Sequence, residues 1–286
     1  MKKSIVFAAI VALAAPAVAA GQNWLTVHAV TPEGGHRVGN PAAQNKLIEF
    51  VSYTCPLCGE FFMEADGSTQ QAAIAPIAAP AGQSWVDTAT ETPEGGILLG
   101  NPNAPIKLME YGSLTCPACA AFDAEAGEAI KNKYVASGVV SFELRNQIHN
   151  AIDLALVKLT RCTGDATSVI PLSTQIWANL QQITAPVQQN PTAIEQTMAL
   201  PEAQRFPALA DTLGLTEFFA ARGVPADQQR QCLSDFAGIQ EIADRSNTQS
   251  EELDVTGTPT FFINGRNLGT LGWAELEANL QNAGAR

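Results

Sequence analysis

Basic side chains are scarce in this sequence. The 286 residues include 16 Lys and Arg against 28 Asp and Glu, which gives a formal net charge of −12 at pH 7. Because binding to nucleic acid phosphates needs a basic face, the sequence argues against a nucleic acid partner. Three His and four Met also supply few ligands for a copper carrier. The hydrophobic fraction of 46% and the charged fraction of 15% are those of a folded soluble protein and exclude general disorder.

The first 20 residues contain an apolar run that is too short to span a bilayer comfortably. Lys2 and Lys3 precede this run, and small residues of the A-x-A kind follow it. The order is typical of a secretory signal peptide that is cleaved near Ala19 or Ala20, and a transmembrane anchor is the alternative. We expect residues 1–20 to be removed on export, and the mature chain to be periplasmic with no stable membrane insertion.

An internal repeat relates two stretches of the sequence at a constant offset of 61 residues. Aligned without a gap, residues 21–62 and 82–123 are identical at 21 of 42 positions, which include a Thr-Pro-Glu-Gly-Gly run and a Cys-Pro-x-Cys motif. Chance does not supply such agreement, so the repeat indicates a duplication. The copies diverge after the second cysteine. The sequence predicts a truncated copy at 21–67, a flexible Ala/Pro-rich linker at 68–81 and a complete domain at 82–286.

The hydrophobic pattern of the complete domain predicts an α/β fold. In chain order we expect a strand at 106–111, a helix from the second dithiol to about residue 135, a strand at 140–145, a helical insert at about 150–254, a strand within 258–265 and a helix at 271–281. Glycines and prolines, among them Pro171 and Pro186, punctuate the insert. This order is that of a strand–helix–strand unit interrupted before its second half.

Two Cys-x-x-Cys pairs carry the chemistry that the sequence suggests. Cys116 is expected at a helix N-terminus, where free N–H groups and the helix dipole favour a thiolate, and Cys119, one turn on, is expected to be more buried. Pro117 suits the first helical position. In an exported chain this pattern favours a redox-active Cys116–Cys119 dithiol. One alternative is a structural disulfide. The other is a four-thiolate zinc site shared with Cys55 and Cys58. An oxidising compartment disfavours zinc sites of this kind, so we expect no metal.

Five residues outside the dithiols are further candidates. Pro259 follows Thr258 and precedes an apolar strand, where a cis peptide bond would let the loop face the dithiol; an ordinary trans proline is the alternative. Glu110 lies in the strand that leads to the dithiol, either as a buried carboxyl that moves protons or as an edge residue in water. Cys162 and Cys232, 70 positions apart in the insert, are either a structural disulfide or two buried thiols.

The first copy contains a possible second dithiol, Cys55 and Cys58, but it lacks the following helix and a proline loop of its own. A segment of this size is marginally stable even when all its elements are present. We therefore expect that the first copy does not form a second complete site. Its dithiol could still oxidise locally or exchange with Cys116, since thiol exchange requires only access and a competent thiolate.

Three segments, Lys107–Cys119, Phe142–Asn146 and Val255–Gly265, together resemble DsbA-type thiol:disulfide oxidoreductases. The combination of Cys-Pro-x-Cys, a Glu six positions before the first Cys and a distant Thr-Pro-Thr-Phe-Phe-Ile-Asn-Gly is specific, and the similarity covers about residues 82–286. The resemblance implies a thioredoxin-like fold with an inserted helical subdomain, and it makes 21–67 a truncated thioredoxin-like repeat.

The resemblance also implies a role for each matching residue. Cys116 would be the nucleophile, Cys119 the resolving thiol, Pro259 the cis-proline and Glu110 the buried acid. The implied partners are unfolded or reduced exported proteins and a separate redox partner that resets the dithiol, with no cofactor. One departure is Ala118, which stands where the family's strongest oxidants carry His, so a donor that helps to hold the Cys116 thiolate is missing.

Two functional classes remain open on the residues alone. The first is an exported dithiol oxidoreductase, working as an oxidase or as a reductase or isomerase. The second is a non-enzymatic module that holds peptides or a soft metal through the cysteine pairs. Disulfide exchange measured with Cys116 replaced by Ser distinguishes these classes.

Overall fold

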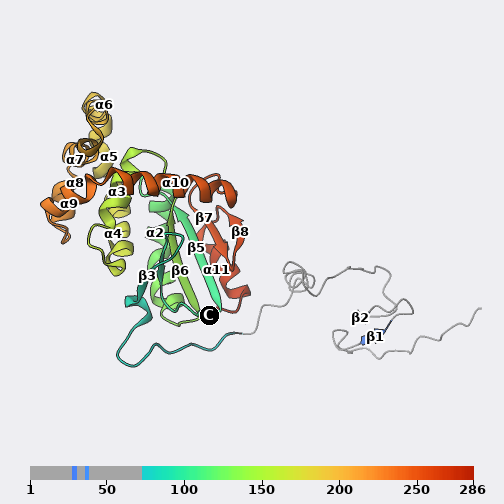
Figure 1. Cartoon of the computed structure of the whole chain (residues 1–286). Coiled ribbons are helices and arrows are strands. Elements are labelled where there is room, and N and C mark those ends of the chain that lie inside the picture. Colours follow the sequence, from blue (N-terminus) through green and yellow to red (C-terminus); the bar gives the residue numbers. More distant parts are fainter. Residues whose placement is uncertain (1–27, 31–35, 39–72) are drawn as a thin grey trace, which may run out of the picture. The chain divides into compact units, whose positions relative to one another are not determined.

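The computed structural model describes residues 28–30, 36–38 and 73–286, and the chain divides into two units, Met1–Asp66 and Gly67–Arg286. The described residues of the first unit form a hairpin in which β1 (His28–Val30) pairs antiparallel with β2 (His36–Val38). The second unit includes residues 82–286 and the elements from η2 to α11 (Figure 1).

A mixed sheet forms the centre of the second unit, and its strand order is β3-β4-β6-β5-β7-β8. The strands are β3 (Ala89–Glu91), β4 (Ile97–Leu99), β5 (Ile106–Gly112), β6 (Val140–Asn146), β7 (Thr260–Ile263) and β8 (Arg266–Gly269). Only β5 and β6 run parallel; the other neighbouring pairs in this sheet are antiparallel. The two strands predicted before and after the dithiol helix are therefore the central parallel pair.

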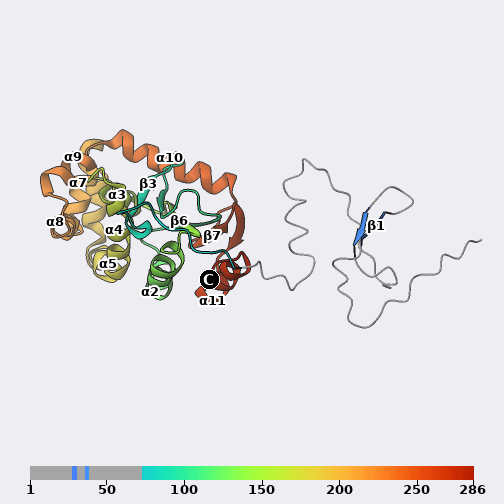
Figure 2. The same cartoon turned by 90° about the horizontal axis from the view of Figure 1, so that it is seen from below.

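Helices cover both faces of this sheet (Figure 2). They are η2 (Trp85–Asp87), α2 (Pro117–Ala129), its π-helical continuation η3 (Ile130–Val135), α3 (Ala151–Thr160), α4 (Ala166–Ala178), α5 (Leu180–Gln189), α6 (Pro191–Met198), α7 (Glu202–Thr212), α8 (Leu215–Ala220), α9 (Ala226–Leu233), α10 (Phe236–Glu252) and α11 (Trp273–Asn282). Helix α2 packs against α4 and α11, and α4 also packs against β3 and β4. The helices from α3 to α10 form the insert between β6 and β7, so the domain is an α/β fold with a helical insertion.

The side chains of β5 alternate between two cores because successive residues of a strand face opposite sides of the sheet. Ile106 and Leu108, each 1% exposed, join the main core together with the residues of α2. Tyr111 faces the other way and packs with Phe262 in a smaller core. Glu110 is two positions from Leu108 and four from Ile106, so its side chain faces the same side of the sheet as theirs, which is the side of the main core.

The insert is closed by the disulfide that the sequence offered as one alternative. Cys162, just after α3, and Cys232, in α9, are joined with an S–S distance of 2.06 Å. Two of the prolines expected to punctuate the insert do not interrupt it, because Pro171 lies inside α4 and Pro186 inside α5. A proline removes one helical hydrogen bond. The packing of α4 onto the sheet and α2 outweighs that loss.

The hairpin β3–β4 repeats the pairing of β1–β2. Ala89–Glu91 and Ile97–Leu99 lie 61 positions after the strands of the first hairpin, since 89 − 28 and 97 − 36 both equal 61. The registers also agree: His28 faces Val38 as Ala89 faces Leu99. The offset of the sequence repeat is thus also the offset between two hairpins of the same register. Residues 39–67 of the first copy, with Cys55 and Cys58, lie outside the described residues.

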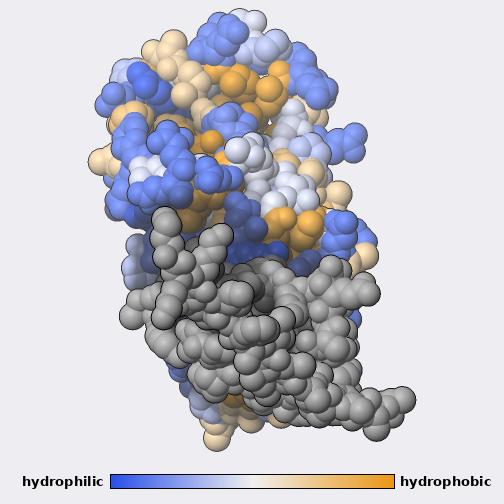
Figure 3. All heavy atoms as spheres, turned by 90° about the vertical axis from the view of Figure 1, so that its right-hand side faces the viewer, coloured by the Kyte–Doolittle hydropathy of each residue, from blue (hydrophilic) through white to orange (hydrophobic). Residues whose placement is uncertain are grey.

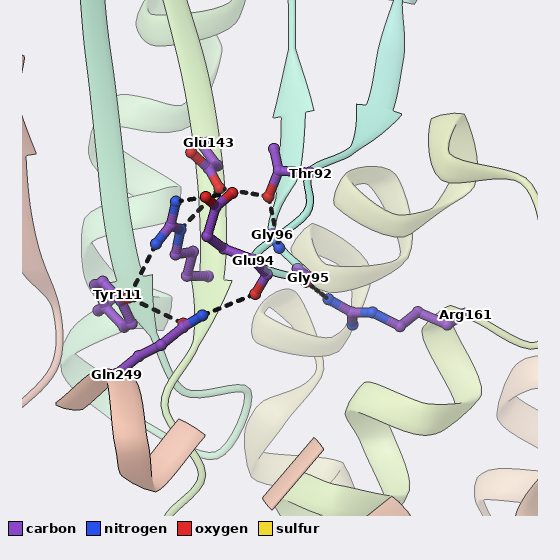
Figure 4. Close-up of polar contacts among 9 residues, drawn as sticks. Thr92, Glu94, Gly95, Gly96, Tyr111, Glu143, Arg161 and Gln249 are labelled. Carbon is purple, nitrogen blue, oxygen red and sulfur yellow. Dashed lines mark hydrogen bonds and ion pairs between the residues drawn. The ribbon is translucent and has the colours of Figure 1, made fainter. Parts of the chain in front are cut away.

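The turn between β3 and β4 holds the insert against the sheet (Figure 4). Its backbone carbonyls accept hydrogen bonds from two separate helical segments. Gln249 of α10 donates to the carbonyl of Glu94 at 2.9 Å, and Arg161, just after α3, donates to the carbonyl of Gly95 at 3.1 Å. The short turn therefore contacts both ends of the insert.

Two glycines make this close approach possible. Gly95 has a φ of +76°, a left-handed backbone conformation that favours glycine. A Cβ atom on Gly96 would lie 2.2 Å from Oε1 of Glu143, the oxygen to which the Thr92 hydroxyl donates a hydrogen bond at 2.9 Å. The Thr-Pro-Glu-Gly-Gly run of the second copy thus forms a tight turn that packs against β6 and the insert.

Part of the run predicted to be a flexible linker lies on the domain. The backbone N–H of Ile74 donates to the carbonyl of Gly284 at 2.9 Å, and that of Ile77 donates to the carbonyl of Ser137 at 2.8 Å. The indole Nε1 of Trp85 donates to the carbonyl of Ile77 at 2.7 Å. Composition did not indicate this docking because most of these hydrogen bonds join backbone groups that are distant in sequence.

The surface of the second unit carries few large exposed apolar groups. Among the described residues, Ile77 is the only large hydrophobic side chain that counts as exposed, at 37%. Figure 3 shows hydrophobic residues in separate groups between hydrophilic ones on the visible described face. In the same part of the chain, no helix has the length and hydropathy needed to cross a membrane.

Candidate functional site

The second dithiol lies at the start of α2. Cys116 is the N-cap residue, Pro117 takes the first helical position, and the Sγ atom of Cys116 accepts a hydrogen bond from the backbone N–H of Cys119 at 3.4 Å. Cys116 is 9% exposed, whereas Cys119 is fully buried. Both are free thiols, so the structure describes the reduced form. Both cysteines are largely buried, and Cys116 is the more exposed of the two.

A loop from the far end of the sequence faces this dithiol. The peptide bond between Thr258 and Pro259 is cis, which is one of the two alternatives that the sequence left open. The Cys116 thiol donates a hydrogen bond to the carbonyl oxygen of Thr258 at 3.4 Å. The pairing of β7 with β5, in which Thr260 faces Tyr111, brings the loop to this position.

Glu110 lies below the dithiol on the central strand β5. Because β5 is paired on both sides, by β6 and β7, the residue does not lie on an edge strand. Its side chain is 3% exposed, and its Oε1 atom has no hydrogen-bond partner among the described residues. Burial raises the pKa of Glu110 to about 8, with further contributions from the charges of Asp123 and Cys116. At neutral pH this carboxyl therefore holds a proton that it can release at slightly higher pH.

The environment of Cys119 opposes its ionisation. Burial raises the pKa of its thiol above the ordinary value, and the neighbouring charge of Glu110 raises it further. The nearby backbone of Ser113 and side chain of Thr258 lower the pKa of Cys119 in part. Since the thiolate is the reactive species, Cys119 needs a base nearby to react. Glu110 is the carboxyl whose charge acts on the Cys119 thiol.

A buried aspartate that sequence reasoning missed fixes the loop before the dithiol. Asp153, in the first turn of α3, is fully buried. Its carboxylate accepts hydrogen bonds from the Ser113 hydroxyl at 2.9 Å, the Thr115 backbone N–H at 3.0 Å and the His149 backbone N–H at 3.0 Å. The sequence contains one signal that could have identified Asp153: it is the only acidic residue in the apolar run that follows Asn150, the N-cap of α3.

Among the described residues, no group of three or more His, Cys, Asp or Glu side chains is arranged to hold a metal ion. Cys116 and Cys119 are brought together as a pair with the Thr258–Pro259 loop. Cys55 and Cys58, which would complete a four-thiolate set, lie outside the described residues. The described part of the site is thus a two-thiol arrangement.

The two thiols are expected to react with an alkylating agent at very different rates. Cys116 is 9% exposed and caps the helix, whereas Cys119 is fully buried and has a raised pKa, so a pulse of iodoacetamide at neutral pH should modify Cys116 at least about tenfold faster. Mass spectrometry of peptides from the reduced protein measures the two rates separately. The same pulse in denaturant is the control and should give nearly equal rates. Equal rates in the folded protein would contradict the assignment of Cys116 as the reactive thiol.

The sequence matches a protein-family model described as Thioredoxin over residues 31–76 and again over 92–282. The two matches begin 61 positions apart, since 92 − 31 equals 61, which is the offset of the internal repeat. Together they cover more than half of the chain. The second match contains the dithiol at the start of α2 and the loop that faces it.

Curated relatives come from several Rickettsia species and carry the name "Putative protein-disulfide oxidoreductase". The protein from Rickettsia prowazekii is 25% identical over 172 residues, which are 60% of this chain and 55% of that protein. The protein from Rickettsia bellii is 26% identical over 172 residues, covering 60% of this chain and 58% of that protein. The chain therefore spans little more than half the length of these relatives.

Solved structures show the same fold. A protein-disulfide isomerase from Novosphingobium aromaticivorans is 31% identical, with a TM-score of 0.60 over 64% of this chain and 94% of that one. Wolbachia pipientis alpha-DsbA1 has a TM-score of 0.54 over 67% of this chain and 90% of that one, at 22% identity. Taken with the family model and the α/β architecture, these findings place the chain in the thioredoxin family, with the helical insertion of DsbA-type proteins.

Proposed function

We propose that this protein is a thiol:disulfide oxidoreductase that exchanges disulfides with other proteins through the Cys116-Pro-Ala-Cys119 motif. The observation that carries the proposal is the asymmetric pair of free thiols, with Cys116 at the N-cap of α2 and 9% exposed, and Cys119 fully buried one turn on. The names of the Rickettsia relatives and of the Novosphingobium structure support the same class of reaction.

The exchange proceeds through a mixed disulfide. In the oxidising direction a substrate thiolate attacks Sγ of Cys116 in the Cys116–Cys119 disulfide, and the sulfur–sulfur bond breaks as Cys119 leaves and takes a proton. A second substrate thiolate then attacks the substrate sulfur of the mixed disulfide, and Cys116 leaves. Two electrons pass from the substrate dithiol to the protein, which ends in the reduced form described here. The reverse order of steps reduces a substrate disulfide.

Glu110 donates and accepts the protons of Cys119 in this scheme. When Cys119 leaves, its thiolate takes a proton from the neutral carboxyl beneath it; when Cys119 attacks, the Glu110 carboxylate accepts the thiol proton. The pKa of about 8 lets both forms of Glu110 exist near neutral pH. The carbonyl of Thr258, which accepts a hydrogen bond from the Cys116 thiol, lies where it can face a bound substrate sulfur.

The decisive experiment is reductive cleavage or oxidative refolding of a disulfide-bonded protein with Cys116→Ser. We expect loss of nearly all exchange activity, because the accessible sulfur is removed. Cys119→Ser is the matched variant: it should accumulate a mixed disulfide between Cys116 and the substrate, visible on a non-reducing gel. A Cys116→Ser protein with full exchange activity would refute the proposal.

The partners and location follow as parts of the proposal. Residues 1–20 are read as a signal peptide, which delivers the chain to the periplasm, where reduced or unfolded exported proteins are its substrates. A separate redox partner then returns the dithiol to its starting state. Oxidase and reductase or isomerase directions use the same steps, and the reduction potential of the Cys116–Cys119 pair decides between them.

The first copy is proposed to be dispensable for exchange. Deleting residues 21–72 should leave the exchange rate of the remaining domain within about twofold, because the dithiol, the loop and their supporting strands all lie after residue 82. The rate is measured in the same assay on the purified deletion protein. Loss of most activity in a folded protein would show that Cys55 and Cys58 take part.

A longer deletion provides the matched comparison. Removing 21–81 also removes Ile74 and Ile77, whose backbone groups bond to Gly284 and Ser137. This second protein should be less stable than the first by about 1–3 kcal/mol, since two internal backbone hydrogen bonds and the acceptor for Trp85 are lost. Urea unfolding of the two deletion proteins measures the difference.

A further inference from the structure

A cavity of about 440 Å³ lies on the main-core side of the sheet, between α2, α4 and the strands β3, β4 and β6. Apolar side chains form much of its wall, including Val86, Leu99, Phe122, Ile130, Phe142 and Ile170. Its volume falls within the range of pockets that hold small organic molecules. Of the residues that line it, the exchange scheme above uses only Glu110.

Glu110 forms part of the wall of this cavity. The residue is 97% buried, and its Oε1 atom has no hydrogen-bond partner among the described residues. A buried polar group without a partner destabilises a fold, so it usually marks a place where a further donor binds. Its Oε1 atom lies beside Gly112 of the same strand, where an added Cβ would be 3.0 Å away. The unpartnered acid is therefore held at the wall of a roomy apolar pocket.

The remaining charges around the cavity are predominantly acidic. Asp87 of η2, Asp123 and Glu128 of α2 and Lys131 of η3 line it, which gives three acids and one base besides Glu110. The lining residues from β3, β4, β6 and α4 contribute no titratable side chain. The thiols Cys116 and Cys119 lie near Glu110 and add no positive charge. This distribution favours a cation over an anion or a neutral ligand.

We propose that the cavity is a binding site for a small organic cation with a flat apolar body. Its amidinium or ammonium group would donate hydrogen bonds to the carboxylate of Glu110, which is the strong, charge-assisted kind of contact. Its body would pack between Phe122 and Phe142 from the two sides of the cavity, where an aromatic ring finds offset aromatic neighbours. The site is distinct from the rim where Cys116 meets a protein substrate.

Binding of such a cation is coupled to release of a proton. Glu110 has a pKa of about 8 in the protein, so below that pH its neutral carboxyl must lose a proton to the solvent before it pairs with the cation. For a ligand that stays charged throughout, affinity should rise about tenfold for each pH unit up to 8 and then level off. Asp123, whose pKa is also raised by burial, lines the same cavity.

The test is calorimetric titration with benzamidine, which is charged across this pH range, and with neutral benzamide, which has nearly the same shape. At pH 8 we expect benzamidine to bind the reduced protein at least about tenfold more tightly than benzamide. Glu110→Gln should reduce benzamidine affinity by at least about tenfold and remove its pH dependence. Glu202→Gln, at an exposed position on α7, is the matched control and should change neither.

A second variant tests the cavity without altering any charge. Ala89→Leu places a larger apolar group at the wall and should weaken benzamidine binding by at least about tenfold while Glu110 stays in place. Equal benzamidine affinity of the wild type and either variant, equal affinity for the amide, or no saturable binding of benzamidine at all would overturn the proposal. Because only binding is measured, the result is independent of the exchange activity.

Discussion

Replacing Glu110 by Gln is expected to stabilise the reduced protein by an amount that grows as the pH rises from about 4.5 to about 8. The carboxyl has a pKa of 4.5 when unperturbed and about 8 in the folded protein, because burial disfavours its charged form. Between these values the folded state holds a proton that the unfolded state has lost, so the wild type loses stability as the pH rises. The amide of Gln does not titrate and avoids this loss.

The size of this effect follows from the linkage slope. One proton of difference changes the free energy of unfolding by about 1.4 kcal/mol per pH unit, so the advantage of Glu110→Gln should reach a few kcal/mol near pH 8 and stay constant above it. Urea unfolding of both proteins at a series of pH values measures it. Glu202→Gln, on the exposed face of α7, should show no such trend. A difference between wild type and Glu110→Gln that does not change with pH would show that the carboxyl titrates normally.

The central strands and the dithiol helix could be predicted from sequence because their signals are local. The apolar runs predicted at 106–111 and 140–145 are the buried parallel pair β5 and β6. A proline at the first helical position and a cysteine at the N-cap mark the start of α2. Such elements are specified by residues close together in the chain, and the structure differs from the prediction only at their ends.

The hairpin β3–β4 and the strand β8 could not be predicted in the same way. Each of these strands has three or four residues, too few to establish a period of alternation. They form because a neighbouring strand is already in place: β4 pairs with β6, and β8 pairs with β7. These short strands are therefore fixed by pairing with strands that are distant in sequence. The turn at Gly95 and Gly96 is the only part of the hairpin β3–β4 that can be recognised in the sequence.

The site shows the same division between local and long-range information. The Cys-x-x-Cys spacing and the Thr-Pro pair are visible in sequence, whereas burial of Glu110 depends on β6 and β7 pairing on both sides of its strand. The resemblance to DsbA-type proteins implied this burial; alternation alone left it open. Asp153 was missed because its partners, Ser113 and Thr115, lie about 40 positions earlier in the chain.

Removing the Cys162–Cys232 disulfide is expected to be the most destabilising change to the insert. The bridge closes a loop across 70 positions, and closing so long a loop in the unfolded chain is worth roughly 4 kcal/mol in the chain-entropy model. A protein with both cysteines changed to Ala should lose about this amount in urea unfolding. The two helical segments should stay in contact, since Gln228 of α9 also donates a hydrogen bond to the carbonyl of residue 162 at 2.6 Å.

The single variants Cys162→Ala and Cys232→Ala separate the bridge from the packing of its sulfur atoms. If the covalent link provides the stability, each single variant should lose nearly as much as the double variant, because breaking either end opens the same loop. If the thiols only fill space, the two losses should instead add. Disulfide exchange through Cys116 should persist in all three proteins below their unfolding midpoints, since the bridge joins α9 to the end of α3, whereas the dithiol lies at the start of α2. Unchanged stability of the double variant would contradict the assigned role of the bridge.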